Sequence, residues 1–208
     1  MCQGGLREHC RDRTVLGIAG RDGCFAERFT LPVINLLPVP DGLDDDRAVF
    51  TEPLAAAFQI MRQLTIEGSP YITVLADGRL GLCETSTVHP RLLDGFGLRA
   101  DQDIVVDCTG SASGLVTAMA MVRPRGKIVM KTTIAPRADG ATLDLSPIVI
   151  NEIELIGSRC GPFPEALGAL ANESVDVLSL ISRRMSLSEG VEAIRAAQQP
   201  GVINVLLQ

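Results

Sequence analysis

Two glycines after an apolar run are the first residues in the chain whose types and spacing indicate chemistry. The run from Ile72 to Ala76 predicts a buried strand, and it breaks into Asp77-Gly78-Arg79-Leu80-Gly81. A buried strand that ends in a glycine turn lets backbone N–H groups and a helix start face a pyrophosphate. Ala76 stands where the G-x-G-x-x-G pattern has its first glycine, while Gly78 and Gly81 keep the other two. The stretch is therefore either a nucleotide-binding turn or a turn of purely structural purpose.

A second glycine turn follows another apolar run. The run from Ile104 to Cys108 predicts a strand, and Thr109-Gly110-Ser111 then forms a turn that precedes an apolar helical pattern from Ala112 to Val122. Serine is a preferred helix cap, so this turn either contacts a ligand or only caps the helix.

Acidic and thiol side chains supply the candidate metal ligands. Glu52 lies beside Pro53 at the start of an Ala-rich helical pattern. It is either a carboxylate that the helix dipole favours at this position or a functional acid at a domain junction. Cys2 and Cys10 lie in a glycine-containing loop that either ligates zinc or is an ordinary loop. A structural zinc site needs four ligands, usually in close pairs, and adjacent His9 does not readily complete such a set.

Composition narrows the classes of protein. The chain is 46% hydrophobic and 21% charged over 208 residues, which is enough apolar matter for a packed core. A net charge of −6 argues against nucleic acid or an acidic membrane surface as partners. The N-terminal residues contain no apolar signal region, and we find no run long enough to span a bilayer, so we expect a cytoplasmic protein with its six cysteines as free thiols.

The elements that position these residues alternate in type. Residues 14–40 read as short β segments broken by Gly and Pro, and residues 48–64 as a helix. Strands are then expected at 72–76, 104–108, 127–132 and 154–157, with helices at 112–122, 164–172 and 187–197 and a closing strand at 202–207. Strands that alternate with helices indicate an α/β fold with an open parallel sheet.

Taken together, these stretches make the sequence resemble the zinc-dependent medium-chain dehydrogenase/reductase family, in particular its alcohol, threonine and sorbitol dehydrogenase branch. The stretches that carry the resemblance run in order along nearly the whole chain: CQGGLREHC, RTVLGIAGRDGCFAERFTLP, EPLAAAFQI, VLADGRLGL, VVDCTGSASG, RPRGKIVMKTT, ELIGSRCG and LSEGVEAIRAAQQPGVINVLL.

The resemblance implies two domains. Residues 1–53 and 185–208 would form part of a GroES-like β domain, and residues 54–184 a reduced Rossmann domain. The spacing between Leu82 and Ile104 is too short for two strand-helix units, so the family's second and third strands appear to be deleted, leaving the order 1-4-5-6. Such a sheet has an exposed edge, and we expect copies of the chain to associate through sheet edges.

The resemblance also implies the site. NAD(P) would contact the cofactor residues Gly78, Arg79, Leu80, Gly81, Cys108, Thr109, Gly110, Ser158 and Arg159. Arg159 is alternatively a surface charge, and Cys108 a small buried hydrophobe. Glu52 matches a ligand of the catalytic zinc, and Cys2 and Cys10 match half of a structural zinc site, while the other ligands belong to a part that the sequence does not contain. One carboxylate does not hold a catalytic zinc.

Two functional hypotheses follow. The chain is an NAD(P)-dependent oxidoreductase acting on a small alcohol or polyol, with missing ligands supplied by another polypeptide. Alternatively, it is a catalytically inactive fragment whose sheet edges support oligomerisation.

Overall fold

The computed structural model describes residues 9–75, 100–134 and 142–208. Contacts divide the chain into two compact units, one of residues 1–39 with 179–208 and the other of residues 40–178. The assignment of a β domain and a cofactor domain to these parts of the sequence stays a prediction.

The larger unit is built on a four-stranded parallel sheet. Strands β1 (Ile72–Leu75), β2 (Gln102–Asp107), β3 (Val122–Met130) and β4 (Glu154–Gly157) lie side by side in chain order. Ile72 pairs with Ile104, and Lys127 pairs with Glu154, all in parallel. The expected α/β fold with a parallel sheet is therefore confirmed.

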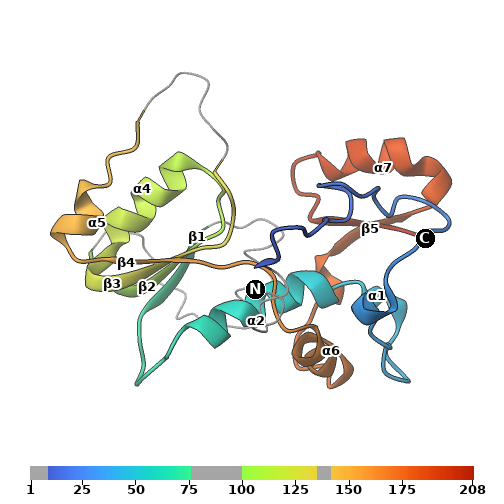
Figure 1. Ribbon diagram of the computed structural model, residues 1–208, viewed down its shortest axis with the longest axis horizontal. Helices are drawn as coiled ribbons and strands as arrows, with labels where there is room; N and C mark the ends of the chain where they lie inside the picture. Colours follow the sequence, from blue (N-terminus) through green and yellow to red (C-terminus); the bar gives the residue numbers. More distant parts are fainter. Residues whose placement is uncertain (1–8, 76–99, 135–141) are drawn as a thin grey trace. The chain divides into compact units, whose positions relative to one another are not determined.

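Helices cover both faces of this sheet because residues of one strand alternate between the faces. On one face, Val105 packs with Leu115 and Met119 of α4 (Ala112–Met121), and Figure 1 shows α4 lying over the strands. On the other face, Ile104 and Val106 pack with Ile60 of α2 (Thr51–Gln63). The central strand β2 is thus buried on both sides, as its continuous apolar run predicts.

The remaining helices of this unit are short. α1 (Asp45–Ala48) begins at the cap residue Asp44, whose carboxylate accepts a hydrogen bond from the backbone N–H of Arg47. α5 (Ser146–Ile150) precedes β4, and α6 (Phe163–Ala171) follows it and contacts α2. The helix expected over 48–64 is therefore observed as α2, with the short helix α1 before it.

An ion pair joins the amino ends of the strands. The Asp103 carboxylate accepts a hydrogen bond from Arg123 Nε at 2.7 Å and another from the backbone N–H of Tyr71 at 2.8 Å. The hydrogen bond from Arg123 holds the pKa of Asp103 below its usual value, and the bond from Tyr71 lowers the pKa further. Asp103 thereby links β2 to residues at the starts of β1 and β3.

This ion pair predicts an acid-sensitive stability. Because the pKa of Asp103 is lower in the folded protein than in the unfolded chain, its stabilisation is present above the unfolded pKa of about 3.9 and is lost as the pH falls through the folded pKa. We expect Asp103→Asn to reduce the free energy of unfolding by about 1 kcal/mol at pH 7, and by clearly less below pH 3. Urea unfolding at both pH values measures this, with exposed Glu67→Gln as the control. A loss that is the same at both pH values would contradict the prediction.

The smaller unit contains the parallel pair β5 (Ile181–Met185) and β6 (Asn204–Leu207) with α7 (Gly190–Ala197). A capping box formed by Ser186 and Glu189 opens the 3-10 helix Leu187–Glu189 that precedes α7. The sequence predicted β6 and α7 but not β5.

The short strands expected from residue 14 to residue 40 were a wrong prediction. This segment contains one isolated antiparallel bridge, between Val15 and Ala19, and a 3-10 helix at Val33–Asn35. A strand requires a neighbour to pair with its backbone, and none of the described strands pairs with this segment.

Candidate cofactor site at the carboxyl edge of the sheet

The loop after β2 is held in place by a buried carboxylate. Asp107 is 2% exposed, and its Oδ1 accepts hydrogen bonds from the backbone N–H of Thr109 at 2.9 Å and from Thr109 Oγ1 at 2.7 Å. Ser111 then caps α4, because its Oγ accepts a hydrogen bond from the backbone N–H of Gly114 at 3.0 Å. The predicted cap at this turn is confirmed. These hydrogen bonds fix the backbone of the loop at the carboxyl edge of the sheet, where open α/β sheets bind their ligands.

Gly110 brings the loop close to the end of the neighbouring strand β3. Its φ of +65° lies in the left-handed region, which favours glycine. A Cβ added to Gly110 would lie 3.4 Å from Thr132 Oγ1 and 3.5 Å from the carbonyl oxygen of Thr133. A side chain at this position would therefore contact the residues that follow β3.

Thr132 presents an unsatisfied polar atom at this edge. Its Oγ1 is buried and has no hydrogen-bond partner among the described residues. A buried hydroxyl without a partner costs free energy, and a bound ligand with a polar group would satisfy it. The ends of β2 and β3 thus offer a polar contact to a ligand bound at this edge.

Ser158 marks the end of the next strand, β4. It is 6% exposed, its backbone N–H donates to the carbonyl oxygen of Met130, and its Oγ accepts a hydrogen bond from Lys131 Nζ at 3.2 Å. Lys131 is half-buried, and its ammonium group is held at this edge by the buried Ser158 hydroxyl. Arg159 is exposed.

The structure brings together only some of the residues predicted from sequence. Thr109 and Gly110 lie on the loop after β2, and Ser158 lies at the end of β4, all at the carboxyl edge. Cys108 is buried and packs on the face of the sheet covered by α2. The predicted turn from Gly78 to Gly81 lies outside the described residues.

Three residues of this edge had no role in the sequence interpretation: Asp107, Lys131 and Thr132. The available signal was position, since each stands at or directly after the end of an apolar strand. Only the structure shows that Asp107 accepts hydrogen bonds from Thr109, or that Thr132 Oγ1 has no partner within the described parts of the chain.

The predicted zinc ligands do not form a metal site in the described parts of the chain. Glu52 lies exposed in the first turn of α2, Cys10 is half-buried in the other unit, and Cys2 lies outside the described residues. No group of three or more His, Cys, Asp and Glu side chains that could hold a metal ion occurs within residues 9–75, 100–134 and 142–208. The residues that the structure describes therefore do not fit a catalytic zinc.

Comparison with known proteins identifies the class of fold. The structure superposes on L-idonate 5-dehydrogenase from Escherichia coli with a TM-score of 0.86, at 21% identity, over 99% of this chain and 70% of that chain. It superposes on acetophenone reductase from Geotrichum candidum in complex with NAD with a TM-score of 0.78, at 17% identity, over 96% and 66% of the two chains. The fold is that of these dehydrogenases and reductases. No family model matches the sequence.

Sequence comparison gives the more particular relationship. The chain is 23% identical to sorbitol dehydrogenase from Halalkalibacterium halodurans, a match that covers 99% of this chain and 71% of the relative. The resemblance to the zinc-dependent alcohol, threonine and sorbitol dehydrogenases is therefore confirmed along nearly the whole chain, at low identity. The match extends over 246 residues although this chain has 208, so residues of the relative stand opposite gaps in this chain.

Proposed function

We propose that the protein is an oxidoreductase that transfers hydride between a small alcohol or polyol and NAD(P). The observation that carries this proposal is the unsatisfied Thr132 hydroxyl beside Gly110 at the carboxyl edge of a parallel sheet. The similarity to a sorbitol dehydrogenase and to a reductase in complex with NAD supports it. These comparisons favour hydride transfer over the alternative of an inactive fragment.

Each residue at the carboxyl edge would make a different contribution to cofactor binding. Gly110 leaves room for close approach of the cofactor to the backbone, and the Asp107–Thr109 hydrogen bonds keep that backbone in place. Thr132 offers a hydroxyl as donor or acceptor, and Ser158 orients Lys131. Cys108, directly after β2, and Arg159, shortly after β4, are also proposed to contact the cofactor because they lie next to this edge. When bound, the nicotinamide ring supplies the hydride acceptor or donor.

The pyrophosphate would be bound by the glycine turn that follows β1. Gly78, Arg79, Leu80 and Gly81 are proposed for this role because β1 is a parallel strand adjacent to β2, which places its carboxyl end at the same edge. The choice between NAD and NADP depends on a ribose-binding acid that the sequence does not show.

We assign no reaction step to zinc, because the described residues do not fit that metal. Glu52 remains the predicted ligand at its position in α2. Any catalytic metal would need further ligands, since such sites use three protein ligands.

Titration with NADH tests the cofactor site. We expect the purified chain to enhance NADH fluorescence with one site per chain, and Thr132→Val to weaken this binding because it replaces the buried hydroxyl with a methyl group of similar volume. Val116→Thr, on the exposed face of α4, is the matched control and should leave NADH binding unchanged. Absence of any NADH binding by the folded chain would overturn the proposed function in favour of an inactive fragment.

The exposed sheet edges and the cysteines bear on association and cellular location. The strands β1 and β4 are the edges of the described sheet, and Leu155 of β4 is 42% exposed, which supports association of copies through a sheet edge. The described cysteines form no disulfide with one another, which supports a reducing compartment, the cytoplasm. None of the helices in residues 9–75, 100–134 and 142–208 has the length and apolarity needed to cross a membrane.

A further inference from the structure

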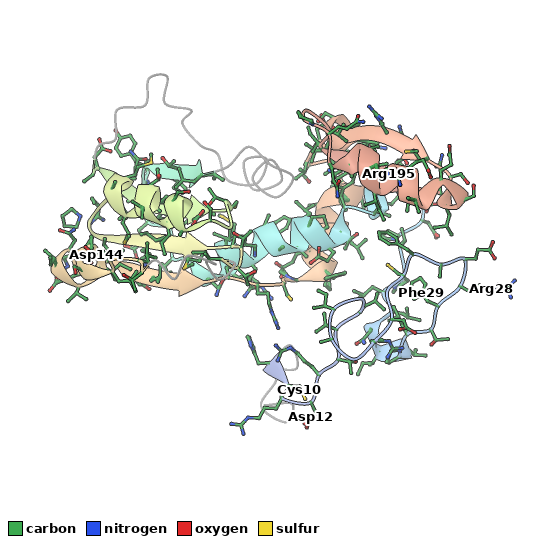
Figure 2. The ribbon with its side chains drawn as sticks, turned by 90° about the horizontal axis from the view of Figure 1, so that it is seen from above. Cys10, Asp12, Arg28, Phe29, Asp144 and Arg195 are labelled. Carbon is green, nitrogen blue, oxygen red and sulfur yellow. The ribbon has the colours of Figure 1, made fainter. Side chains whose placement is uncertain are left out.

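Lysine is rare in this chain, and one of its two lysines lies at the carboxyl edge of the sheet. Of the 19 basic residues, only Lys127 and Lys131 are lysines. Arg28 and Arg195 lie in the smaller unit (Figure 2), where both are exposed and Arg195 forms a surface ion pair with Glu192. Lys131 differs from these surface charges because it is half-buried directly after β3. Partial burial of a cation costs free energy, and a negatively charged ligand offsets that cost.

The backbone of Lys131 is fixed by the sheet. Its N–H donates to the carbonyl oxygen of Asp107 at 2.9 Å. The N–H of Ser158 donates to the carbonyl oxygen of Met130, also at 2.9 Å. The hydrogen-bond ladder therefore continues past the ends of β3 and β4 to both residues. The Lys131 ammonium then donates to the Ser158 hydroxyl at 3.2 Å, which orients the ammonium without supplying a negative charge.

The chain after β4 is also held in one conformation. Gln63 Nε2 of α2 donates to the carbonyl oxygen of Gly157 at 3.1 Å. Cys160 has a φ of +55°, in the left-handed region that is unfavourable for a residue with a Cβ. Gly161 approaches α2 so closely that an added Cβ would lie 1.7 Å from the carbonyl oxygen of Ala55. Backbone strain of this kind persists only where surrounding contacts enforce it, and it is concentrated at binding sites.

The place of Lys131 across the sheet indicates which anionic group it would meet. β3 lies two strands from β1, and neighbouring strands are about 4.8 Å apart, so the ends of β1 and β3 are about 10 Å apart. The pyrophosphate is proposed to bind at the turn after β1, whereas the ammonium is directed to Ser158 after β4, on the side away from β1. In doubly wound sheets the adenosine ribose is bound on the opposite side of the first strand, so the reacting half of the cofactor extends toward β3. An anion beside Lys131 would therefore belong to the substrate.

We propose that the pair of Lys131 and Ser158 binds an anionic group, a carboxylate or a phosphate, of the substrate. This inference rests on the proposed hydride transfer, and it names the substrate class as an alcohol or polyol that carries a negative charge. An ammonium group has three N–H donors, so Lys131 can hold the Ser158 hydroxyl and an anion together. The hydrogen bond to the anion is charge-assisted and hence strong, and Ser158 acts as the positioning residue.

The presence of only two lysines makes a selective test possible by NMR of the chain labelled with ¹³C-lysine. In the NADH-saturated chain, we expect glycerol 3-phosphate to shift the side-chain signals of Lys131 and to leave those of Lys127 unchanged. Glycerol, which lacks the phosphate, should shift neither. Lys131→Met should weaken the binding of glycerol 3-phosphate by about tenfold or more, and that of NADH by less than about threefold.

The matched control is Lys127→Met, which removes the other half-buried lysine of the chain. Lys127 pairs with Glu154 at 3.2 Å in the strands β3 and β4, away from the carboxyl edge. This variant also assigns the two lysine signals, and it should bind glycerol 3-phosphate as the parent chain does. Ser158→Ala should keep the charge of Lys131 but weaken glycerol 3-phosphate binding, because the ammonium loses its orienting hydroxyl.

The outcomes separate this inference from the proposed function. NADH binding together with Lys131 signals that do not respond to glycerol 3-phosphate would overturn the inference and leave the proposed function standing. Equal weakening of NADH and glycerol 3-phosphate binding by Lys131→Met would assign the anion to the cofactor and would also overturn it. Absence of NADH binding by the folded chain would refute the proposed function, and this inference with it.

Discussion

Gly161→Ala is expected to destabilise the protein by about 3 kcal/mol, a large part of the stability of an ordinary domain. Gly161 lies between β4 and α6, where the chain passes α2. A Cβ at this position would lie 1.7 Å from the carbonyl oxygen of Ala55 and 2.5 Å from its carbonyl carbon. Ala55 is fully buried in the middle of α2, so its backbone cannot yield without breaking the helix or moving it off the sheet.

The matched control for this substitution is Gly168→Ala. Gly168 lies within α6, and nothing lies within 4 Å of an added Cβ. Alanine is the better helix former, so the control should gain about 0.5–1 kcal/mol. Urea unfolding monitored by circular dichroism measures both variants. If Gly161→Ala were as stable as the parent chain, the close approach of α2 to the residues before α6 would be refuted.

The central part of the sheet could be predicted because its signals are local. The apolar run from Ile104 to Cys108 indicates a strand buried on both faces, and the structure places Val105 under α4 and Val106 under α2. The serine cap at Ser111 and the helix that follows were likewise predicted, because capping depends on residues within one turn.

Other features depend on contacts between distant residues and could not be predicted. β5 has the sequence ISRRM, with two arginines in the middle, and is a strand only because it pairs with β6. Residues 14–40 have a strand-like composition, yet they form no sheet with the described residues, since pairing requires a partner that composition does not reveal.

In the candidate site, too, local features could be predicted from sequence and long-range contacts could not. Glycines and small polar residues after strands mark Thr109, Gly110 and Ser158 from sequence alone. The hydrogen bonds from Thr109 to Asp107 are local, since the two residues are two positions apart, whereas the lack of a partner for the Thr132 hydroxyl among the described residues depends on the tertiary packing around it. Zinc was inferred from the resemblance, and the described residues do not assemble its ligands.

Gly110→Ala is expected to weaken NADH binding by about tenfold or more, and it separates ligand binding from backbone strain. The substitution costs about 1–2 kcal/mol of stability because φ at Gly110 is +65°, a conformation unfavourable for a residue with a Cβ. The new methyl group would in addition contact Thr132 Oγ1 and fill the space that the cofactor is proposed to enter. The loss of affinity should therefore exceed what reduced stability alone produces.

Gly68→Ala supplies the matched comparison for this effect. Gly68 has a φ of +70°, but nothing lies within 4 Å of an added Cβ, and it precedes the amino end of β1. Both variants should lose similar stability in urea unfolding, while only Gly110→Ala should lose NADH binding in a fluorescence titration. Equal affinity for NADH in the two variants would remove Gly110 from the cofactor site and would leave its glycine as a requirement of the turn before α4. A selective loss at Gly110 would locate the bound cofactor between the carboxyl ends of β2 and β3, because the two substitutions share the same backbone strain and differ in what the methyl group meets.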